Sequence, residues 1–190
     1  MDNTIRVLGI SGSLRKNSVN SGLLRAAQKV TPPEMVLSVF DLGSIPMYNE
    51  DVLAQEIPET VREFKSKIAA SDALLIATPE YNYSVPGVLK NAIDWASRPP
   101  KDSPLNGKPL AIMGAGGVMG TVRAQMSLRQ IAVFTNMYPL NKPEVLVSRA
   151  HEKFDTEGNL KDEPTLQSIR SLLEALVRWT LQLQGRAVRA

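Results

Sequence analysis

The sequence contains no cysteine and a single histidine, and both facts narrow the chemistry that the protein can perform. Without cysteine there are no disulfides, no thiolate nucleophile, no cysteine-bound iron–sulfur cluster and no cysteine-bound zinc. The one histidine, His151, cannot form a two-histidine metal site, and its neighbours between residues 148 and 159 are polar and of mixed charge. We therefore expect His151 in a solvated loop, and no metal centre.

Long apolar runs are also missing. A membrane-spanning helix needs about 20 consecutive apolar residues, and the apolar opening at residues 5–10 is too short for a secretory signal. The formal charge of +3, from 22 basic and 19 acidic residues, is spread along the chain without a basic stripe, which argues against a nucleic-acid partner. A chain of 190 residues has the size of one domain. We predict a cytoplasmic protein with one domain, residues 1–190.

Short apolar runs alternate along the chain with stretches of helical period. Five runs have the length of a strand, and several are apolar throughout, which is typical of parallel strands covered on both faces. These runs span residues 5–10, 35–40, 73–77, 109–113 and 144–147. Amphipathic stretches predict helices near residues 19–30, 57–68, 88–95, 121–134 and 165–183. Strict alternation of β and α elements predicts a three-layer α/β fold with right-handed crossovers.

In such folds, ligands bind beyond the carboxyl ends of the strands, and three loops at these positions have unusual compositions. The first loop, Ser11 to Ser18, is rich in hydroxyl groups. The second loop, Pro79 to Pro86, carries two tyrosines, and the third loop, Gly114 to Gly120, has four glycines in seven residues. We expect the three loops to form one ligand site.

The first loop has the composition of a phosphate-binding loop but matches neither common nucleotide pattern. Its glycines have the wrong spacing for a dinucleotide fingerprint, and the P-loop pattern is absent. Hydroxyl groups, an amide and one arginine, with a helix N-terminus behind them, suit a terminal phosphate. These side chains are Ser11, Ser13, Arg15, Ser18 and Asn20. Alternatively Ser18 or Asn20 only caps the helix, which explains one polar residue and not five, so a mononucleotide is favoured.

The second and third loops suit a flat ring. Tyr81 and Tyr83 lie between prolines and offer aromatic faces, while Asn82 offers hydrogen bonds to a heterocycle. The glycines of the third loop let a ligand approach the main chain closely. On the other interpretation the tyrosines cover the edge of the sheet and the glycines form a flexible connection.

Two motifs together closely resemble those of the NADPH-dependent FMN reductase family. One is Gly12-Ser13-Leu14-Arg15-x-x-Ser18-x-Asn20, and the other runs from Pro79 to Trp95 and begins Pro-Glu-Tyr-Asn-Tyr-Ser. The likeness continues through residues 123–130 and 141–144 and is greatest to bacterial quinone and chromate reductases. The resemblance implies a flavodoxin-like fold, in which a five-stranded parallel sheet of order 2-1-3-4-5 has helices on both faces, and a noncovalent FMN.

The same resemblance implies which residues bind FMN. It carries over Ser13, Arg15, Ser18 and Asn20 as phosphate ligands, and Glu80, Tyr81, Asn82 and Tyr83 as the loop around the ribityl chain and the ring. Val19, Pro79, Ala115 and Gly116 complete the expected site, with Ala115 contributing its backbone. Similar enzymes are dimers or tetramers, so a homodimer or homotetramer is expected. Arg123 and Glu144 match interface residues, while Met126 stands where similar enzymes often have a tyrosine.

The activity implied is that of an NAD(P)H oxidoreductase with ping-pong kinetics. Hydride passes from NAD(P)H to FMN and then to a quinone, a nitro or azo compound, chromate or a flavin, and the cofactor carries the chemistry, so no catalytic side chain is expected. One alternative is a flavodoxin-like one-electron carrier that does not oxidise NAD(P)H, although such carriers are typically acidic. A second is a receiver-type signalling domain, which needs acidic residues for Mg²⁺ where Ser11-Gly12-Ser13 stands.

Overall fold

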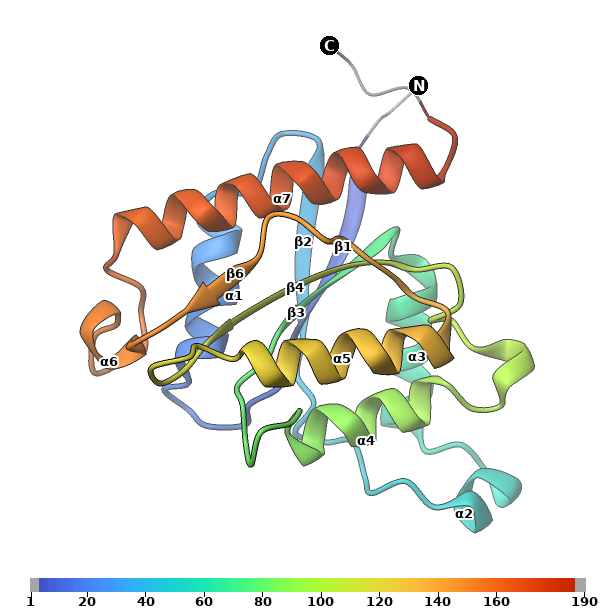
Figure 1. Cartoon of the computed structure of the whole chain (residues 1–190). Coiled ribbons are helices and arrows are strands. Elements are labelled where there is room, and N and C mark those ends of the chain that lie inside the picture. The colour runs from blue at the N-terminus through green and yellow to red at the C-terminus, as the bar shows by residue number, and fades with distance from the viewer. Residues whose placement is uncertain (1–3, 187–190) are drawn as a thin grey trace.

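A computed structural model describes residues 4–186 of the chain. Its centre is a parallel sheet with strand order β2-β1-β3-β4-β5, in which β6 also pairs with β4 (Figure 1). The strands are β1 (Ile5–Ser11), β2 (Met35–Phe40), β3 (Ala73–Ala77), β4 (Pro109–Ala115), β5 (Tyr138–Pro139) and β6 (Val145–Val147). This order confirms the predicted flavodoxin-like topology.

Helices cover both faces of the sheet. The α-helices are α1 (Val19–Lys29), α2 (Glu50–Gln55), α3 (Glu59–Ala70), α4 (Gly87–Ala96), α5 (Val122–Thr135), α6 (Ala150–Lys153) and α7 (Glu163–Leu183), with a 3₁₀ turn η1 at Pro100–Asp102. Helices α1 and α7 pack on one face, and α3, α4 and α5 pack on the other. Each face has its own hydrophobic cluster, so the sheet is the middle of three layers.

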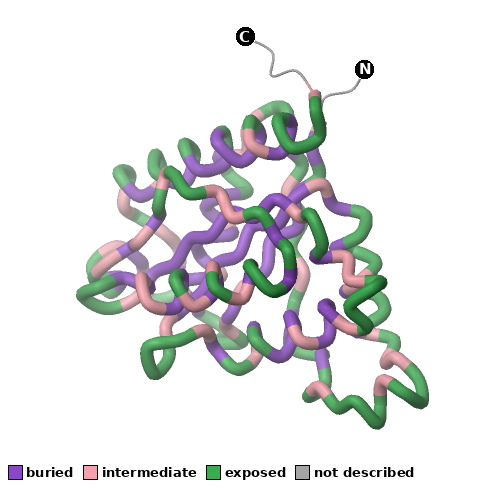
Figure 2. Tube along the Cα trace, turned by 45° about the vertical axis from the view of Figure 1, so that its right-hand side comes forward, coloured by how far each residue is buried: buried purple, intermediate pink, exposed green. Residues whose placement is uncertain are grey.

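The apolar strands are buried because both of their faces are covered. Every residue of β3 is buried, and successive side chains alternate between the two clusters: Leu75 packs towards α1 and α7, while Leu74 and Ile76 pack towards the opposite helices. In Figure 2 the strands form the purple interior, and α7 shows buried residues on one side only.

The edge beyond β4 differs from the sequence prediction. The predicted fifth strand at residues 144–147 is β6, which begins at Val145, and the shorter strand β5 precedes it along the same edge. Two residues carry no periodic signal, so the pattern missed β5. The helices α2 and α6 were also not predicted. Pro58 is the N-cap residue of α3.

None of the helices in residues 4–186 is both long enough and apolar enough to cross a membrane. The longest, α7, runs over Glu163–Leu183 with a buried apolar stripe and an exposed polar side.

Candidate functional site

The three predicted loops meet at the carboxyl edge of the sheet and surround a cavity of about 180 Å³. Each loop follows a strand, β1, β3 or β4, and these three strands are neighbours in the sheet. The cavity is lined by Ser13, Arg15, Ser18, Val19, Asn20, Pro79, Glu80, Tyr81, Ala115 and Gly116. All of these are predicted site residues, and of the residues predicted for the site Ser11, Asn82 and Tyr83 do not line the cavity.

The start of α1 supplies hydrogen-bond donors to this cavity. Ser18 is the N-cap residue: its hydroxyl accepts hydrogen bonds from the N–H groups of Asn20 (3.2 Å) and Ser21 (3.5 Å). The capping role that the sequence left open for Ser18 is therefore real. Val19, the first helical residue, also lines the cavity, so its N–H and the positive end of the helix dipole lie there. Arg15 is exposed, and its guanidinium donates to the carbonyl oxygen of Asn17 (3.2 Å).

Asn20 has a role in the fold that the sequence did not reveal. Its side chain is 2% exposed, and its carboxamide donates to the carbonyl oxygen of Ala115 (3.0 Å) and accepts from the N–H of the same residue (2.9 Å). This pair of bonds ties α1 to the end of β4 and fixes the backbone of Ala115 beside the cavity. Asn20 therefore positions the backbone of Ala115, because its carboxamide already uses one donor and its acceptor oxygen for these two bonds.

The second loop ends in a tight turn. Tyr81 and Ser84 exchange two backbone hydrogen bonds, and Asn82 and Tyr83 between them have φ values of 50° and 65°. Positive φ at both central residues is the mark of a type I′ turn, where asparagine is common and a tyrosine is disfavoured. The turn points the 70%-exposed Tyr83 away from the cavity lining and leaves Tyr81 on it.

Glu80 joins the second loop to α5. One carboxylate oxygen accepts from the N–H groups of Arg123 (2.8 Å) and Ala124 (3.2 Å), and the other pairs with the Arg123 guanidinium (3.1 Å). The α5 N-cap residue, Thr121, makes no side-chain capping bond, so Glu80 caps the helix from another loop. The Arg123 guanidinium also lies 4.0 Å from the ring centre of Tyr83. Arg123, expected at a subunit interface, is thus engaged within its own chain.

The third loop forms a second projecting turn. The N–H of Gly120 donates to the carbonyl oxygen of Gly117 (3.1 Å), and Gly120 has a positive φ of 60°. A Cβ atom at Gly116 would lie 2.4 Å from the carbonyl oxygen of Gly120, so the main chain folds back too closely for any side chain. The tip residues Val118 and Met119 are exposed beside the cavity.

Comparisons with known proteins identify the family of this chain. The profile of the NADPH-dependent FMN reductase family matches residues 5–152, which is more than half of the chain. The chain belongs to this family.

Relatives match over nearly the full length. A protein of Pseudomonas aeruginosa described as an NAD(P)H-dependent FMN reductase is 53% identical over 186 residues, which cover 97% of this chain and 100% of the relative. An NADPH:quinone oxidoreductase of Arabidopsis thaliana is 44% identical and covers 96% of this chain and 95% of its own. The solved structure of FerB, a flavoenzyme NAD(P)H:(acceptor) oxidoreductase from Paracoccus denitrificans, has a TM-score of 0.85 at 36% identity, covering 94% and 98% of the two chains. The family resemblance inferred from the two motifs is confirmed.

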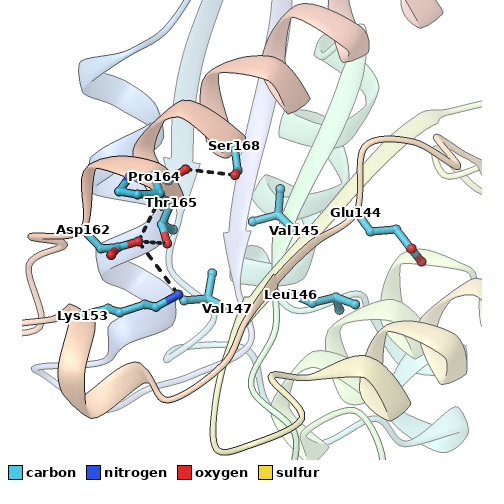
Figure 3. A pocket seen from close by; sticks show the side chains of 9 residues that line it. All are labelled: Glu144, Val145, Leu146, Val147, Lys153, Asp162, Pro164, Thr165 and Ser168. Carbon is cyan, nitrogen blue, oxygen red and sulfur yellow. Dashed lines mark hydrogen bonds and ion pairs between the residues drawn. The ribbon is translucent and has the colours of Figure 1, made fainter.

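A second cavity, of about 190 Å³, lies between β6 and the start of α7 and has different chemistry (Figure 3). Its acidic residue Asp162 accepts hydrogen bonds from the hydroxyl and the N–H of Thr165, which lower the pKa of the carboxyl group. Lys153 lies 3.9 Å from the same carboxylate, and Glu144 is at the opposite end of the cavity. Asp162 is thus paired with Thr165 and Lys153, and Glu144 is paired with Lys142. These charged side chains already have partners, so we assign no ligand to this second cavity.

No group of three or more His, Cys, Asp or Glu side chains that could hold a metal ion exists within residues 4–186. His151 is exposed, at the start of α6 and not in a loop as predicted.

Proposed function

We propose that the protein is an FMN-dependent NAD(P)H oxidoreductase that works as one domain. The observation that carries this proposal is the convergence of the first loop, the start of α1 and Tyr81 on one cavity, in a chain of the FMN reductase family. When bound, FMN supplies the transfer of two electrons from NAD(P)H to an acceptor. The protein binds and orients the cofactor and controls access to it.

The donor groups around the cavity fit the phosphate of FMN. Ser13 and Arg15 line it, and Val19, which also lines it, offers its backbone N–H, since the N–H groups of Asn20 and Ser21 already donate to the Ser18 hydroxyl. Together they provide hydroxyl, guanidinium and amide donors to a dianionic group, each charge-assisted bond contributing about 1.5–3 kcal/mol. Ser18 and Asn20 fix the backbone that carries these donors, and Val19 is the first helical residue beside them.

The second and third loops fit the ribityl chain and the isoalloxazine ring. Pro79, Tyr81, Ala115 and Gly116 line the same cavity beyond its phosphate end. The exposed tips of the two turns, Tyr83 and Val118, with Asn82 beside them, extend this surface outward. A flat apolar acceptor can pack there against the exposed face of the cofactor, so quinones suit the site well. Chromate and nitro or azo compounds are further acceptors we propose.

We also propose that the protein is a homodimer or homotetramer in the cytoplasm. Helix α5 presents Met126, Val133 and Phe134 on its outward face, and Val133 is 83% exposed. Apolar patches of this kind mark contacts between proteins. Glu144, at the edge of the sheet, pairs with Lys142 of its own chain (2.9 Å) and stays available to a neighbouring subunit. Val133→Asp is expected to lower the molar mass measured by light scattering, and Val36→Asp, at an exposed position of β2, is its control.

The decisive experiment for the activity is simple. Protein purified and supplied with FMN is expected to oxidise NADPH when benzoquinone is added, and to lose this activity when FMN is removed. If the yellow protein is reduced only by one-electron donors and leaves NADPH untouched, it is the one-electron carrier instead. A protein that takes up no FMN would contradict the whole proposal.

A further inference from the structure

A short hairpin lies behind the phosphate end of the site. Its residues, Phe154 to Leu160, connect α6 to α7, and a bridge between its two ends closes it. In Figure 1 this orange segment lies at the same end of the molecule as the blue α1. We call it the brace hairpin. It follows the region matched by the family profile, which ends at residue 152.

The brace hairpin is held rigid by Asp155. Its carboxylate accepts hydrogen bonds from the N–H groups of Glu157 (3.0 Å) and Asn159 (2.8 Å) and from the Asn159 side chain (3.2 Å). These bonds hold the pKa of Asp155 below its usual value. Gly158 closes the turn with a φ of 76°, which a glycine adopts without strain.

One side of the brace hairpin is bound to α1 through Arg25. The guanidinium donates to the carbonyl oxygens of Gly158 (2.9 Å) and Glu157 (3.3 Å), and Nε donates to the side-chain oxygen of Asn159 (3.2 Å). The contact is also tight between main chains, because a Cβ atom at Gly22 of α1 would lie 1.9 Å from the carbonyl oxygen of Gly158.

The other contact reaches the first loop itself. The Asn17 side chain donates to the carbonyl oxygen of Thr156 (3.1 Å), and a Cβ atom at Gly158 would lie 2.7 Å from the carbonyl oxygen of Asn17. The same Asn17 carbonyl accepts from the Arg15 guanidinium. A chain of contacts thus leads from the brace hairpin through Asn17 to Arg15, whereas neither Asn17 nor Arg25 lines the cavity.

We infer that the brace hairpin positions the phosphate-binding loop, with Asn17 and Arg25 as its positioning residues. This inference rests on the proposed function. Residues 14–17 are all exposed. The hydrogen bonds from the N–H of Arg15 to the Ser13 hydroxyl (3.3 Å) and from the N–H of Ser18 to the carbonyl oxygen of Arg15 (3.1 Å) stay within the loop, whereas that of the Asn17 side chain reaches the brace hairpin. A loop that is ordered before binding loses less conformational entropy when it binds an anion, which raises affinity. The brace acts on the phosphate end only, so it should raise affinity for FMN and leave the affinity for riboflavin unchanged.

The test compares FMN with riboflavin, which has the same ring and ribityl chain without the phosphate. Dissociation constants are measured by fluorescence titration of the full-length protein freed of flavin. Asn17→Ala and Arg25→Lys are each expected to raise the dissociation constant for FMN about two- to tenfold, which is the effect of losing about one hydrogen bond. Riboflavin binding should not change. Arg25→Lys keeps the positive charge, so long-range attraction to the phosphate is preserved.

Arg129→Lys is the matched control. Arg129 of α5 likewise donates to a loop carbonyl, that of Leu140 (2.9 Å), and to an asparagine side chain, that of Asn141 (3.3 Å), but this loop lies away from the first loop. It should leave both flavin affinities unchanged, and thermal unfolding of all variants reports general damage.

Three results would overturn the inference. Equal weakening of FMN and riboflavin would indicate a general loss of structure, and unchanged FMN affinity in both variants would show that the brace is irrelevant to binding. Weakening by Asn17→Ala alone would make Asn17 a direct ligand. If the unmodified protein binds FMN no more tightly than riboflavin, the proposed phosphate site itself fails, which is a separate result.

Discussion

The phosphate end and the ring end of the site are built in opposite ways. At the phosphate end, Ser18 and Asn20 are buried and hydrogen-bonded to main chain, so the start of α1 beside the cavity is held by the fold. At the ring end, Tyr83, Val118 and Met119 stand exposed at the tips of two tight turns. Donors that are already ordered before binding favour the binding of an anion, because less conformational entropy is lost. A flat apolar ring is bound instead by the apolar surface that becomes buried when the ring packs on it.

The largest expected effect comes from the buried clamp at the phosphate end. Asn20→Ala leaves the N–H and the carbonyl of Ala115 buried without their partners. Each such group costs about 1–3 kcal/mol, so the free energy of unfolding, measured with urea, should fall by about 2–6 kcal/mol. FMN affinity should fall as well, because the clamp holds α1 to the end of β4.

Asn91→Ala is the control for this prediction. Asn91 of α4 is also buried and also binds main chain in two directions, accepting from the N–H of Tyr48 (2.7 Å) and donating to the carbonyl of Pro46 (2.8 Å). The Pro46 carbonyl keeps a hydrogen bond from the Trp95 indole N–H (2.8 Å), so Asn91→Ala leaves one backbone group without its partner and should lower the free energy of unfolding by about 1–3 kcal/mol. It should not weaken FMN binding to the folded protein. Equal losses of FMN affinity in both variants would contradict a special role for Asn20.

Arg15→Ala separates binding from folding. Arg15 is exposed, so its removal should change the free energy of unfolding by no more than about 0.5 kcal/mol. The loss of one charge-assisted hydrogen bond, about 1.5–3 kcal/mol, should raise the dissociation constant for FMN about 10- to 150-fold. Calorimetric titration with FMN and riboflavin checks this, and a matching loss for riboflavin would remove Arg15 from the phosphate site.

Glu80→Ala tests the connection between the second loop and α5. It removes the cap of α5 and the ion pair with Arg123, and the Glu80 side chain is only 12% exposed. A lost helix cap costs about 0.5–2 kcal/mol. We therefore expect the free energy of unfolding to fall by about 1–2 kcal/mol, which is measured as a lower Tm. Glu144→Ala, which breaks the more exposed pair with Lys142, should change Tm much less. Equal shifts would mean that Glu80 is not a cap.

Tyr83→Gly has the smallest expected effect and examines the ring end. Glycine relieves a left-handed conformation that costs other residues about 1–2 kcal/mol, while the contact with Arg123 that is lost contributes about 0.5–1 kcal/mol. The free energy of unfolding, measured with urea, should therefore be unchanged or up to about 1.5 kcal/mol higher. Asn82→Gly should gain less, because asparagine tolerates this conformation. Clear destabilisation by Tyr83→Gly would show that the tyrosine serves the fold.

Much of this architecture could be predicted because its signals are local. Continuous apolar runs such as Ala73–Ala77 identified buried parallel strands, and the three loops with unusual composition followed neighbouring strands as expected. The prediction missed β5 because Tyr138–Pro139 is too short to show a period. It considered Asn20 only as a phosphate ligand or a helix cap, because its partner Ala115 lies 95 positions away and contributes only backbone atoms, which leave no trace in a sequence pattern.

By itself, the sequence determined the alternation of strands and helices, the family and the residue types gathered at the site, because periodicity and motifs are properties of neighbouring residues. The tertiary structure decided which side chains remain free to meet a ligand. It assigned Glu80 to capping α5, bound Asn20 to β4 and placed the brace hairpin behind Asn17. These roles depend on contacts between distant segments, and such contacts form only when the sheet brings its loops to one edge.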